Sequence, residues 1–511
     1  MITEEDKEKF AQLQNKLKEF WEDGDILDQD DQDILVIPSF SIDQRVGQKI
    51  AGFLHYEERL LFSLIRLRNP QTRLIYVTAQ PLSPIIIEYY LQLLPGIPFS
   101  HARDRLLLLS TYDNSLKPLT QKILERPRLV ARIKKFLRPD KSFMVCFNST
   151  VLEQELSVRL GIPLLASSPD LKYWGSKKGS RDIFAECNIP HPLGSELVFS
   201  VDKLLEEIAI LLEKKPGIKR VVIKLNEGFS GEGNAILDLT EIYPKIKEEN
   251  LQHNERKYLI EKIITNAKVQ GEGETWETFS KRIPELGVIV EEFIEGEEKY
   301  SPSVQGYITP NGRVEILSTH DQILGGEDKQ IYLGCLFPAR DEYRMQLQEL
   351  GLKIGENLAK KGALERFSVD FLVVKDGSKW QIYAIEINLR KGGTTHPFMT
   401  LKFLTNGVYN YQDGLFYSPE NKPKYYIASD NLQKPQYHGL LPNDLMDIIT
   451  KHRLHFDSST KTGTVFHLMG ALSEFGKLGL TSIGNSREEA LAIYENVERV
   501  LDEETESMRW Y

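Results

Sequence analysis

The chain has 511 residues, of which 41% are hydrophobic and 27% charged, ordinary values for a globular protein. Its length predicts about three structural units. The 64 Lys and Arg residues against 74 Asp and Glu give a net charge of −10, so the chain lacks the basic balance of a general nucleic-acid or anionic-membrane binder. Any anionic ligand must therefore be held by a local site.

The cysteines and the apolar segments indicate a cellular compartment. Cys146, Cys187 and Cys335 are far apart and show no CxxC spacing, so we expect neither a disulfide framework nor a cysteine-based zinc site. The acidic start lacks the apolar run of a signal peptide, and the most apolar stretch, 84–99, is too interrupted to cross a bilayer. We therefore expect a cytoplasmic protein that binds neither nucleic acid nor membrane.

The first third of the chain predicts an α/β domain. Residues 4–22 have the apolar spacing of an amphipathic helix, and an acidic linker follows. Unalternating apolar runs then recur between helical patterns, which is typical of a parallel sheet covered on both faces. The expected strands are 34–37, 74–77, 106–109, 144–147 and 162–165, and the expected helices are 43–68, 83–93, 117–137 and 150–160. We predict an N-terminal helix and linker at 1–29 and a doubly wound parallel sheet at 30–170.

The rest of the chain predicts α+β structure, because runs of strands are followed by helices. The expected strands are 196–200, 219–225, 287–294, 303–309, 313–319, 367–374 and 380–388, and the expected helices are 176–187, 201–214 and 342–361. Residues 240–285 are polar and poorly patterned. We place one α+β unit at 171–405 and a C-terminal α+β domain at 406–511, with strands at 424–428, 463–469 and 477–483 and a helix at 486–503.

A glycine-rich loop is the first motif that carries chemistry. An apolar strand bears Lys224 near its end, and a loop with glycines at 228, 231 and 233 leads into a second strand. Glycines let backbone N–H groups approach a phosphate closely, and the lysine adds a positive charge. No Gly-Lys-Ser/Thr sequence opens a helix here, so this is not a Walker loop. An ordinary glycine-rich hairpin is the alternative interpretation.

A second motif is a pair of strands with oxygen ligands. Glu386 and Asn388 are two residues apart on an apolar strand, so they share one face. If the hairpin pairs even positions with even ones, Asp370 on the partner strand joins that face. Three such ligands suit Mg²⁺, and a buried carboxylate needs a cation. The alternative is a solvated strand face.

Two charged segments complete the set. The strand near 288–294 ends among carboxylates that include Glu291, Glu295 and Glu298, which can accept hydrogen bonds from a base or a ribose. The helix at 176–187 carries Lys177 and Lys178 in its first turn, where the helix dipole does not favour cations, which suggests an anionic ligand. A solvated acidic edge and a solvated helix surface are the alternatives.

The order of these four motifs along the chain resembles the ATP-grasp superfamily, in which two α+β subdomains hold Mg-ATP and activate a carboxylate as an acyl phosphate. The resemblance covers about residues 30–400. Three further phrases, at 386–397, 55–61 and 462–468, are similar to the pheganomycin-type peptide ligase group and would extend the resemblance to most of the chain.

The resemblance implies a role for each motif. ATP would be held by the residues of the basic helix, the glycine loop and the acidic strand end. For the phosphates these are Lys177 (with Lys178 as the one-residue alternative), Lys224, Gly228, Ser230, Gly231 and Gly233. For the adenosine they are Glu291 at the adenine amino group, the backbone of Ile294 along the base, and Glu298 at the ribose. The magnesium ions would be bound by Asp370, Glu386 and Asn388.

One arginine is expected to stabilise the transferring phosphoryl group or to anchor the acceptor carboxylate. D-alanine ligases carry an Arg two residues before the metal-binding Asp, where this chain has Ser368. Arg390 and Arg366 are the two candidates, and the sequence does not choose between them.

The implied function is that of an ATP-dependent carboxylate–amine ligase, with ATP and Mg²⁺ as cofactors and ADP and phosphate as products. Its substrates would be small, such as an amino acid or a short peptide, and family analogy allows a homodimer. The alternatives are an ATP-grasp enzyme with a thiol or phosphate acceptor and a nucleotide-binding regulatory or scaffold protein. The intact set of Asp370, Glu386 and Asn388 argues against the last.

Several other polar residues have less specific interpretations. The residues His320, Asp321 and Gln322 are read as a turn at the end of a strand near the site. His396 either lines the acceptor pocket or follows a helix cap made by Thr394 or Thr395, and His467 is read as a satisfied core histidine. The group Glu57, Glu58 and Arg59 is read as an interface or a solvated helix face.

Overall fold

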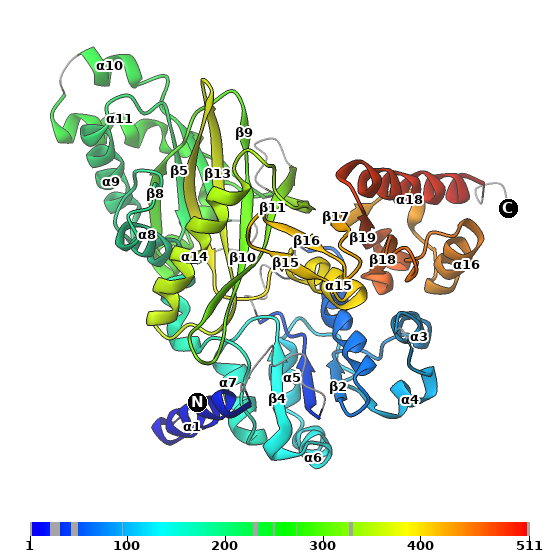
Figure 1. Cartoon of the computed structure of the whole chain (residues 1–511). Coiled ribbons are helices and arrows are strands. Elements are labelled where there is room, and N and C mark those ends of the chain that lie inside the picture. The colour runs from blue at the N-terminus through cyan, green and yellow to red at the C-terminus, as the bar shows by residue number, and fades with distance from the viewer. Residues whose placement is uncertain are drawn as a thin grey trace.

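The structure is a computed structural model of the whole chain. The residues that it describes are 3–20, 31–41, 47, 50–94, 96–227, 233–248, 251–271, 273–325 and 331–507. Within these residues the chain forms three sheets, one parallel and two antiparallel, and the parallel sheet lies below the other two in the view of Figure 1.

The N-terminal sheet is parallel throughout and has the strand order β3-β2-β1-β4. Its strands are β1 (Asp33–Ile37), β2 (Arg73–Thr78), β3 (Leu106–Ser110) and β4 (Ser142–Cys146). Both faces are covered: Ile34 and Val36 belong to one hydrophobic cluster, and Leu35 and Ile37 belong to another. Burial on both faces explains why the strands read as continuous apolar runs, and it confirms the predicted doubly wound fold.

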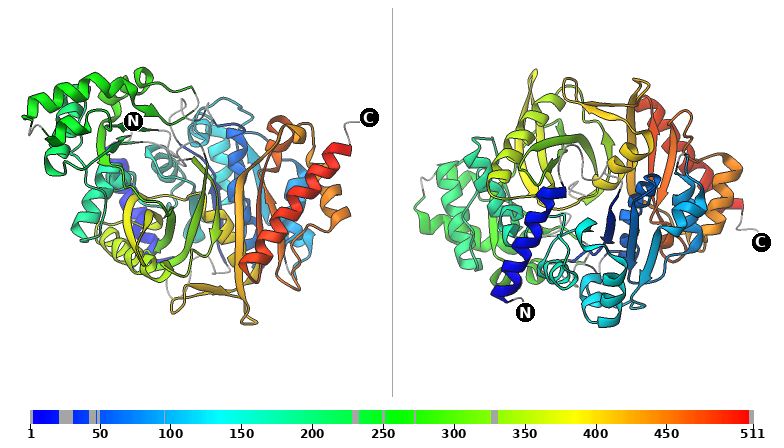
Figure 2. Two further views of the ribbon diagram at one scale, coloured as in Figure 1. Left: turned by 90° about the horizontal axis from the view of Figure 1, so that it is seen from above. Right: turned by 60° about the horizontal axis from the view of Figure 1, so that its bottom comes forward.

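Helices connect these strands, and one more helix follows β4. They are a long 3₁₀ helix η2 (Phe53–Arg68), α3 (Pro84–Gln92), α4 (Phe99–Asp104), α5 (Leu119–Leu124), α6 (Pro127–Phe136) and α7 (Val151–Leu160). Helix α7 begins with a capping box, in which Thr150 and Glu153 satisfy each other's backbone N–H groups. Helix α1 (Glu4–Phe20) packs against α7 at the edge of this unit (Figure 2).

Two expectations for this region were wrong. Residues 162–165 do not form a strand, because only Leu164 pairs, as a single bridge with Met144. The helix expected at 117–137 is divided into α5 and α6, because Pro127 starts a new helix where it has no N–H to lose.

A small antiparallel sheet follows, with the strand order β7-β6-β5-β8. Its strands are β5 (Arg220–Leu225), β6 (Asn234–Asp238), β7 (Lys268–Val269) and β8 (Val288–Glu292). Helices α9 (Val201–Lys214) and α11 (His253–Ile263) pack against each other and share its hydrophobic cluster. Helix α8 (Lys177–Glu186) precedes this sheet in the chain and packs on the large sheet instead.

Sequence patterns failed in two places here. The strand expected at 196–200 is absent, and this segment instead runs irregularly beside β8, bonding it through Ser195 and Val198. The polar stretch at 240–285 contains several short elements. They are α10 (Tyr243–Glu248), α11, the 3₁₀ turn η5 (Ile264–Asn266), β7, α12 (Trp276–Ser280) and α13 (Ile283–Leu286).

The large sheet has eleven strands and contains the hairpin that was expected to bind metal. Its strands before the C-terminal region are β9 (Lys299–Tyr300), β10 (Pro302–Ile308), β11 (Val314–Gly325), β12 (Ile331–Phe337), β13 (Glu365–Asp376) and β14 (Lys379–Asn388). Helices α8 and α14 (Arg344–Lys360) share one hydrophobic cluster with Val369 and Ile387. Because side chains alternate along a strand, Asp370 and Glu386 lie on the other face.

The C-terminal strands continue the same sheet, because β12 pairs with β17 and β17 pairs with β19. The elements here are α15 (Thr395–Thr405), β15 (Val408–Asn410), β16 (Leu415–Tyr417), β17 (Pro423–Gln433), α16 (Pro442–His452), β18 (Gly463–His467), α17 (Leu472–Phe475), β19 (Lys477–Gly484) and α18 (Arg487–Ser507). Helix α18 lies along β17 and β19 (Figure 1). The division of the chain at residues 29, 170 and 405 remains our proposal.

Candidate nucleotide and magnesium site

The β13–β14 hairpin brings the three expected metal ligands together. Its register places Asp370 opposite Glu386 and Ser368 opposite Asn388, so even positions pair with even ones in this part of the hairpin, beyond the bulge. Asn388 Nδ2 lies 3.2 Å from Asp370 Oδ2 and donates to it. A bulge between Asp370 and Phe371 increases the local twist at this point of the hairpin. The arrangement gathers two carboxylates and one amide on one sheet face.

Gln322 is a site residue that sequence reasoning missed. Its Nε2 donates to Asp370 Oδ1 over 2.7 Å, so both oxygens of this carboxylate are hydrogen-bonded. Residues 320–322 are not a turn, because β11 continues to Gly325. The neighbouring residues serve other contacts: His320 Nε2 lies 2.6 Å from Tyr426 Oη, and Asp321 accepts from Tyr343 Oη over 2.5 Å.

The basic helix α8 sends one lysine toward the hairpin and one away from it. Lys177 forms an ion pair with Glu386. Lys178 pairs with Asp182 at 2.5 Å and with Glu196 at 3.2 Å. Gly179 allows the helix to pack this closely, because a Cβ at that position would lie 1.9 Å from the carbonyl oxygen of Tyr173. Lys177, not its neighbour, therefore lies beside the expected metal ligands.

Lys224 is buried in an ion-pair network on the small sheet. Its Nζ lies 2.5 Å from Glu291 Oε2, and Arg181 lies 3.0 Å from Glu291 Oε1. Burial alone would raise the pKa of Glu291, but Lys224 and Arg181 outweigh it and hold that pKa below its usual value. The carboxylate is thus ionised and shared between two cations.

The glycine loop lies largely outside the described residues. Gly228, Ser230 and Gly231 fall there, whereas Gly233 is described and accepts a backbone hydrogen bond from Leu225 over 2.8 Å. Asn226 joins this loop to helix α8, because it accepts from Lys177 N at 3.2 Å and from Lys178 N at 3.0 Å. The loop therefore begins directly against the helix that carries Lys177.

The segment between β8 and β9 connects the small sheet to the large one. Ile294 lies in this segment, and its carbonyl oxygen accepts from Lys299 Nζ over 3.3 Å. Glu298 pairs with Lys375 at 2.7 Å and accepts from Tyr300 Oη at 3.3 Å. Both residues therefore lie on the irregular connection between the two sheets.

The two candidate arginines have different surroundings. Arg390 Nη2 donates to Asn388 Oδ1 over 2.9 Å, so it contacts the expected metal ligands directly. Arg366 is buried and lies on the same face of β13 as Asp370. Its Nη2 atom contacts the Met399 sulfur at 2.7 Å, and its Nε atom lies 3.5 Å from Glu365 Oε1. Arg390 is therefore the better placed of the two.

The donor set fits Mg²⁺ in its chemistry. Burial and the neighbouring Glu386 carboxylate raise the pKa of Asp370 to about 7, because two like charges face each other across the hairpin. A divalent cation would relieve this repulsion, and Asp370, Glu386 and Asn388 offer the oxygen atoms that hard cations prefer. Lys177 and Arg390 supply positive charge beside these carboxylates.

The remaining polar residues lie at the junction of the N- and C-terminal parts. Glu58 and Arg59 are buried, so the solvated interpretation of this group was wrong. Thr394 makes no side-chain cap for α15, and His396 instead contacts Asp430 and His467. His467 is buried and has hydrogen-bond partners, as expected.

Comparisons with known proteins agree with this geometry. The family described as "IQCH-like, ATP-grasp" matches residues 170–412, and the family "PGM1 C-terminal domain" matches residues 444–497. Residues 170–412 therefore match an ATP-grasp domain, in agreement with the resemblance that the order of the motifs indicated.

Two relatives and one solved structure illustrate the likeness. L-propargylglycine–L-glutamate ligase of Streptantibioticus cattleyicolor is 28% identical over 89% of this chain and 91% of that protein. IQ motif-containing protein H of Danio rerio is 20% identical over 90% of this chain, which spans only 47% of that protein. Biotin carboxylase from Campylobacter jejuni superimposes with a TM-score of 0.52 at 12% identity, covering 90% of this chain and 89% of that one. The last likeness shows the fold alone.

Within the described part of the chain, no helix is long and apolar enough to cross a membrane. This agrees with the interrupted apolar stretch at 84–99, of which 84–92 forms the short helix α3.

Proposed function

We propose that this chain is an ATP-dependent carboxylate–amine ligase that makes an amide through an acyl phosphate and releases ADP and phosphate. The observation that carries the proposal is the convergence of Asp370, Glu386 and Asn388 on one sheet face, with Lys177 paired to Glu386. The match to a ligase over 89% of the chain supports the same reaction class.

The phosphates of ATP would lie between the two antiparallel sheets. Lys177 and Lys224 would leave their carboxylate partners to contact phosphate oxygens, with the backbone of the glycine loop closing over them. Mg²⁺, when bound by Asp370, Glu386 and Asn388, neutralises phosphate charge in the reaction. Arg390 would then face the γ-phosphate.

The adenosine would lie along the connection between the sheets. The backbone of Ile294 would line the base, Glu291 would accept from the adenine amino group, and Glu298 would accept from the ribose hydroxyls. Lys375 pairs with Glu298 in this structure, so the ribose would displace this lysine or share the Glu298 carboxylate with it.

The chemistry has two steps. A carboxylate oxygen attacks the γ-phosphorus, the bond to the bridging oxygen of ADP breaks, and an acyl phosphate forms. The amine nitrogen then attacks the acyl carbon, phosphate leaves, and the nitrogen loses a proton. Arg390 stabilises the charge on the transferring group, and exclusion of water protects the acyl phosphate from hydrolysis.

The substrates that we propose are amino acids or short peptides. The resemblance to a peptide ligase group and the relative named L-propargylglycine–L-glutamate ligase support this class. ATP as a substrate and three buried, free cysteines favour a cytoplasmic location.

The test is nucleotide release from Mg-ATP with pooled amino acids and small carboxylates, resolving ADP from AMP. ADP and phosphate that appear only with a particular acid and amine would support the ligase. AMP as the product would exclude an acyl phosphate. Asp370→Ala and Glu386→Ala should each abolish turnover, and activity that survives both changes would contradict the metal assignment.

A further inference from the structure

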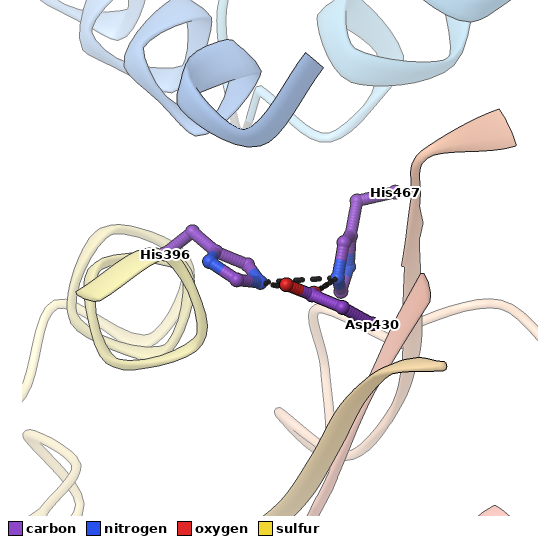
Figure 3. A group of neighbouring side chains, drawn as sticks. All are labelled: His396, Asp430 and His467. Atoms are coloured by element: carbon purple, nitrogen blue, oxygen red, sulfur yellow. Dashed lines mark hydrogen bonds and ion pairs between the residues drawn. The ribbon is translucent and has the colours of Figure 1, made fainter. Parts of the chain in front are cut away.

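A second cluster of metal-type ligands lies outside the nucleotide site. His396, Asp430 and His467 are buried side by side, with exposed fractions of 4%, 2% and 4%. They come from three elements that are distant in the sequence: the first turn of α15, the strand β17 and the end of β18 (Figure 3). Nothing in the proposed ligase reaction uses these side chains.

Three ligand atoms of the cluster converge on one point. His396 Nε2 lies 2.9 Å from Asp430 Oδ1, His467 Nε2 lies 2.6 Å from the same oxygen, and the two nitrogens are 3.0 Å apart. Figure 3 shows both imidazole rings turned edge-on toward the carboxylate. Ligand atoms bound at about 2.1 Å are about 3.0 Å apart at right angles around a metal ion and about 3.4 Å apart around a tetrahedral one, for which this triangle has to widen. The triangle is therefore close to the size that a bound ion requires.

Protons explain the two contacts with Asp430 but leave the contact between the two nitrogens unexplained. An imidazole nitrogen either donates one N–H or accepts on one lone pair. If both Nε2 atoms carry protons, both can donate to Asp430 Oδ1, and the two nitrogens then lie 3.0 Å apart with no hydrogen bond between them. If only one carries a proton, the lone pair of the other faces the Asp430 oxygen. A single metal cation bound by all three atoms would account for each of the three contacts.

The local backbone aims these groups at one another. The register of β17 against β19 shifts between Ser429 and Leu432, and this bulge re-aims Asp430. His467 lies against Gly479, where a Cβ would be 2.3 Å from its Cδ2 and Nε2 atoms. A side chain at position 479 would push the ring out of the cluster, so a glycine here makes the convergence possible.

Charge limits the kind of metal. Arg59 lies 2.6 Å from Asp430 Oδ2, so the second carboxylate oxygen has a cation of its own and Oδ1 faces the histidines. Two neutral imidazoles and one carboxylate compensated by Arg59 offer little to hard Mg²⁺ or Ca²⁺.

We propose that His396, Asp430 and His467 bind a divalent transition metal ion of the kind that prefers imidazole, such as Zn²⁺, at a site separate from the oxygen-lined magnesium site. The ion would join α15, which follows the Arg390 loop, to the C-terminal strands β17 and β18. Its role is to fix these three segments together, and no chemical step is assigned to it.

The test uses the full chain with any affinity tag removed, stripped with a chelator and kept in excess Mg²⁺. Titration with Co²⁺ should give the absorption of a nitrogen- and oxygen-bound ion, with one equivalent per chain. Metal analysis after loading with Zn²⁺ should give the same stoichiometry. Absence of binding to the wild-type chain would overturn the proposal.

Variants separate this cluster from adventitious sites. His396→Gln and His467→Gln should each weaken Co²⁺ binding at least tenfold. His320→Gln is the matched control, since His320 is also buried and bonded to a neighbouring side chain but lies outside the cluster. Equal binding by all three variants would contradict the assignment.

A measurement on the wild-type chain covers the case in which a variant does not fold. X-ray absorption at the metal edge of the Zn²⁺-loaded chain should detect two imidazole ligands. Fewer than two would overturn the proposal. Because neither readout uses ATP or an amine, failure here and failure of the ligase proposal are distinguishable.

Discussion

Gln322 and Asp370 are joined by a hydrogen bond of 2.7 Å between Nε2 and Oδ1, across strands that are 48 residues apart in sequence. The bond fixes one oxygen of the carboxylate, and Asn388 holds the other. Gln322 therefore acts as a positioning residue for the proposed magnesium site.

Gln322→Leu should lower turnover about tenfold and raise the Mg²⁺ concentration required for half-maximal rate, because Asp370 loses its orienting partner. Steady-state ADP release measured against Mg²⁺ concentration checks this. Gln381→Leu is the control, since Gln381 bonds the exposed Asp376 at the turn of the same hairpin. An unchanged Mg²⁺ dependence in Gln322→Leu would show that this bond does not position the ligand.

Lys177 and Lys178 provide a matched pair. Lys177→Ala should weaken ATP binding and reduce turnover by about a hundredfold, because the pairing with Glu386 places its ammonium group beside the phosphates. Lys178→Ala should change either quantity only a few-fold, since that lysine pairs with Asp182 and Glu196. Isothermal titration with a non-hydrolysable ATP analogue compares the two, and equal losses would contradict the assignment.

The two arginines should separate in their effects. Arg390→Met should lower kcat by about a hundredfold or more with little change in ATP affinity, because the charge that it stabilises develops during phosphoryl transfer. Arg366→Met should retain a larger fraction of the wild-type turnover than Arg390→Met does. Single-turnover measurement of ADP formation distinguishes them. A greater loss in Arg366→Met would move the transition-state role to that residue.

Glu291 should be important for folding as well as for ATP binding. Glu291→Gln leaves Lys224 and Arg181 as buried like charges, so the free energy of unfolding should fall by about 3–5 kcal/mol. Glu295→Gln removes a surface pair with Arg220 and should cost at most about 1 kcal/mol. Urea denaturation of both variants measures the difference. Similar losses of unfolding free energy would mean that the buried ion pairs of Glu291 stabilise the fold no more than the surface pair does.

Stability should depend on pH through Glu57. Burial raises the pKa of this carboxyl to about 8 from a value of 4.5 in the unfolded chain. A raised carboxyl pKa favours the protonated form in the fold, so the free energy of unfolding should fall as pH rises from about 4.5 to about 8, by at most about 1.4 kcal/mol per unit.

Glu57→Gln should remove that part of the pH dependence, because an amide does not ionise and its oxygen can still accept from Ala79 N, as Glu57 does over 2.6 Å. Thermal unfolding at a series of pH values from 5 to 9 compares the two chains. A pH profile unchanged by the substitution would show that Glu57 is ionised throughout in the fold.

Local pattern was enough to predict the hairpin that carries Asp370 and Glu386. Alternation along two adjacent strands fixes which residues share a face. The turn sets the register only as far as Phe371, and the bulge after Asp370, which the sequence does not show, places Asp370 opposite Glu386. The order of motifs along the chain then indicated the ATP-grasp resemblance that the family match at residues 170–412 supports. Such features depend on residues close together in sequence, which is why they could be predicted.

Features that depend on distant segments could not be predicted. The Gln322 side chain extends across β10, which lies between β11 and β13 in the sheet, to contact Asp370. Nothing in the sequence near residue 322 indicates that Asp370 is its neighbour. His396, Asp430 and His467 likewise come from three separated segments. Helix α11 was missed for another reason: its buried side is narrow, with Ile260 and Ile263 as its buried residues.

The double ion pair of Glu291 has a consequence for how a nucleotide could be received. If Lys224 moves to a phosphate, Glu291 keeps Arg181, so the carboxylate is never left buried without a counterion. The exchange then loses only the ion pair between Lys224 and Glu291, and no charge is left without a counterion in the low-dielectric interior. One lysine is thereby free to change partners between the empty and the loaded states, while the sheet around it keeps its charge balance.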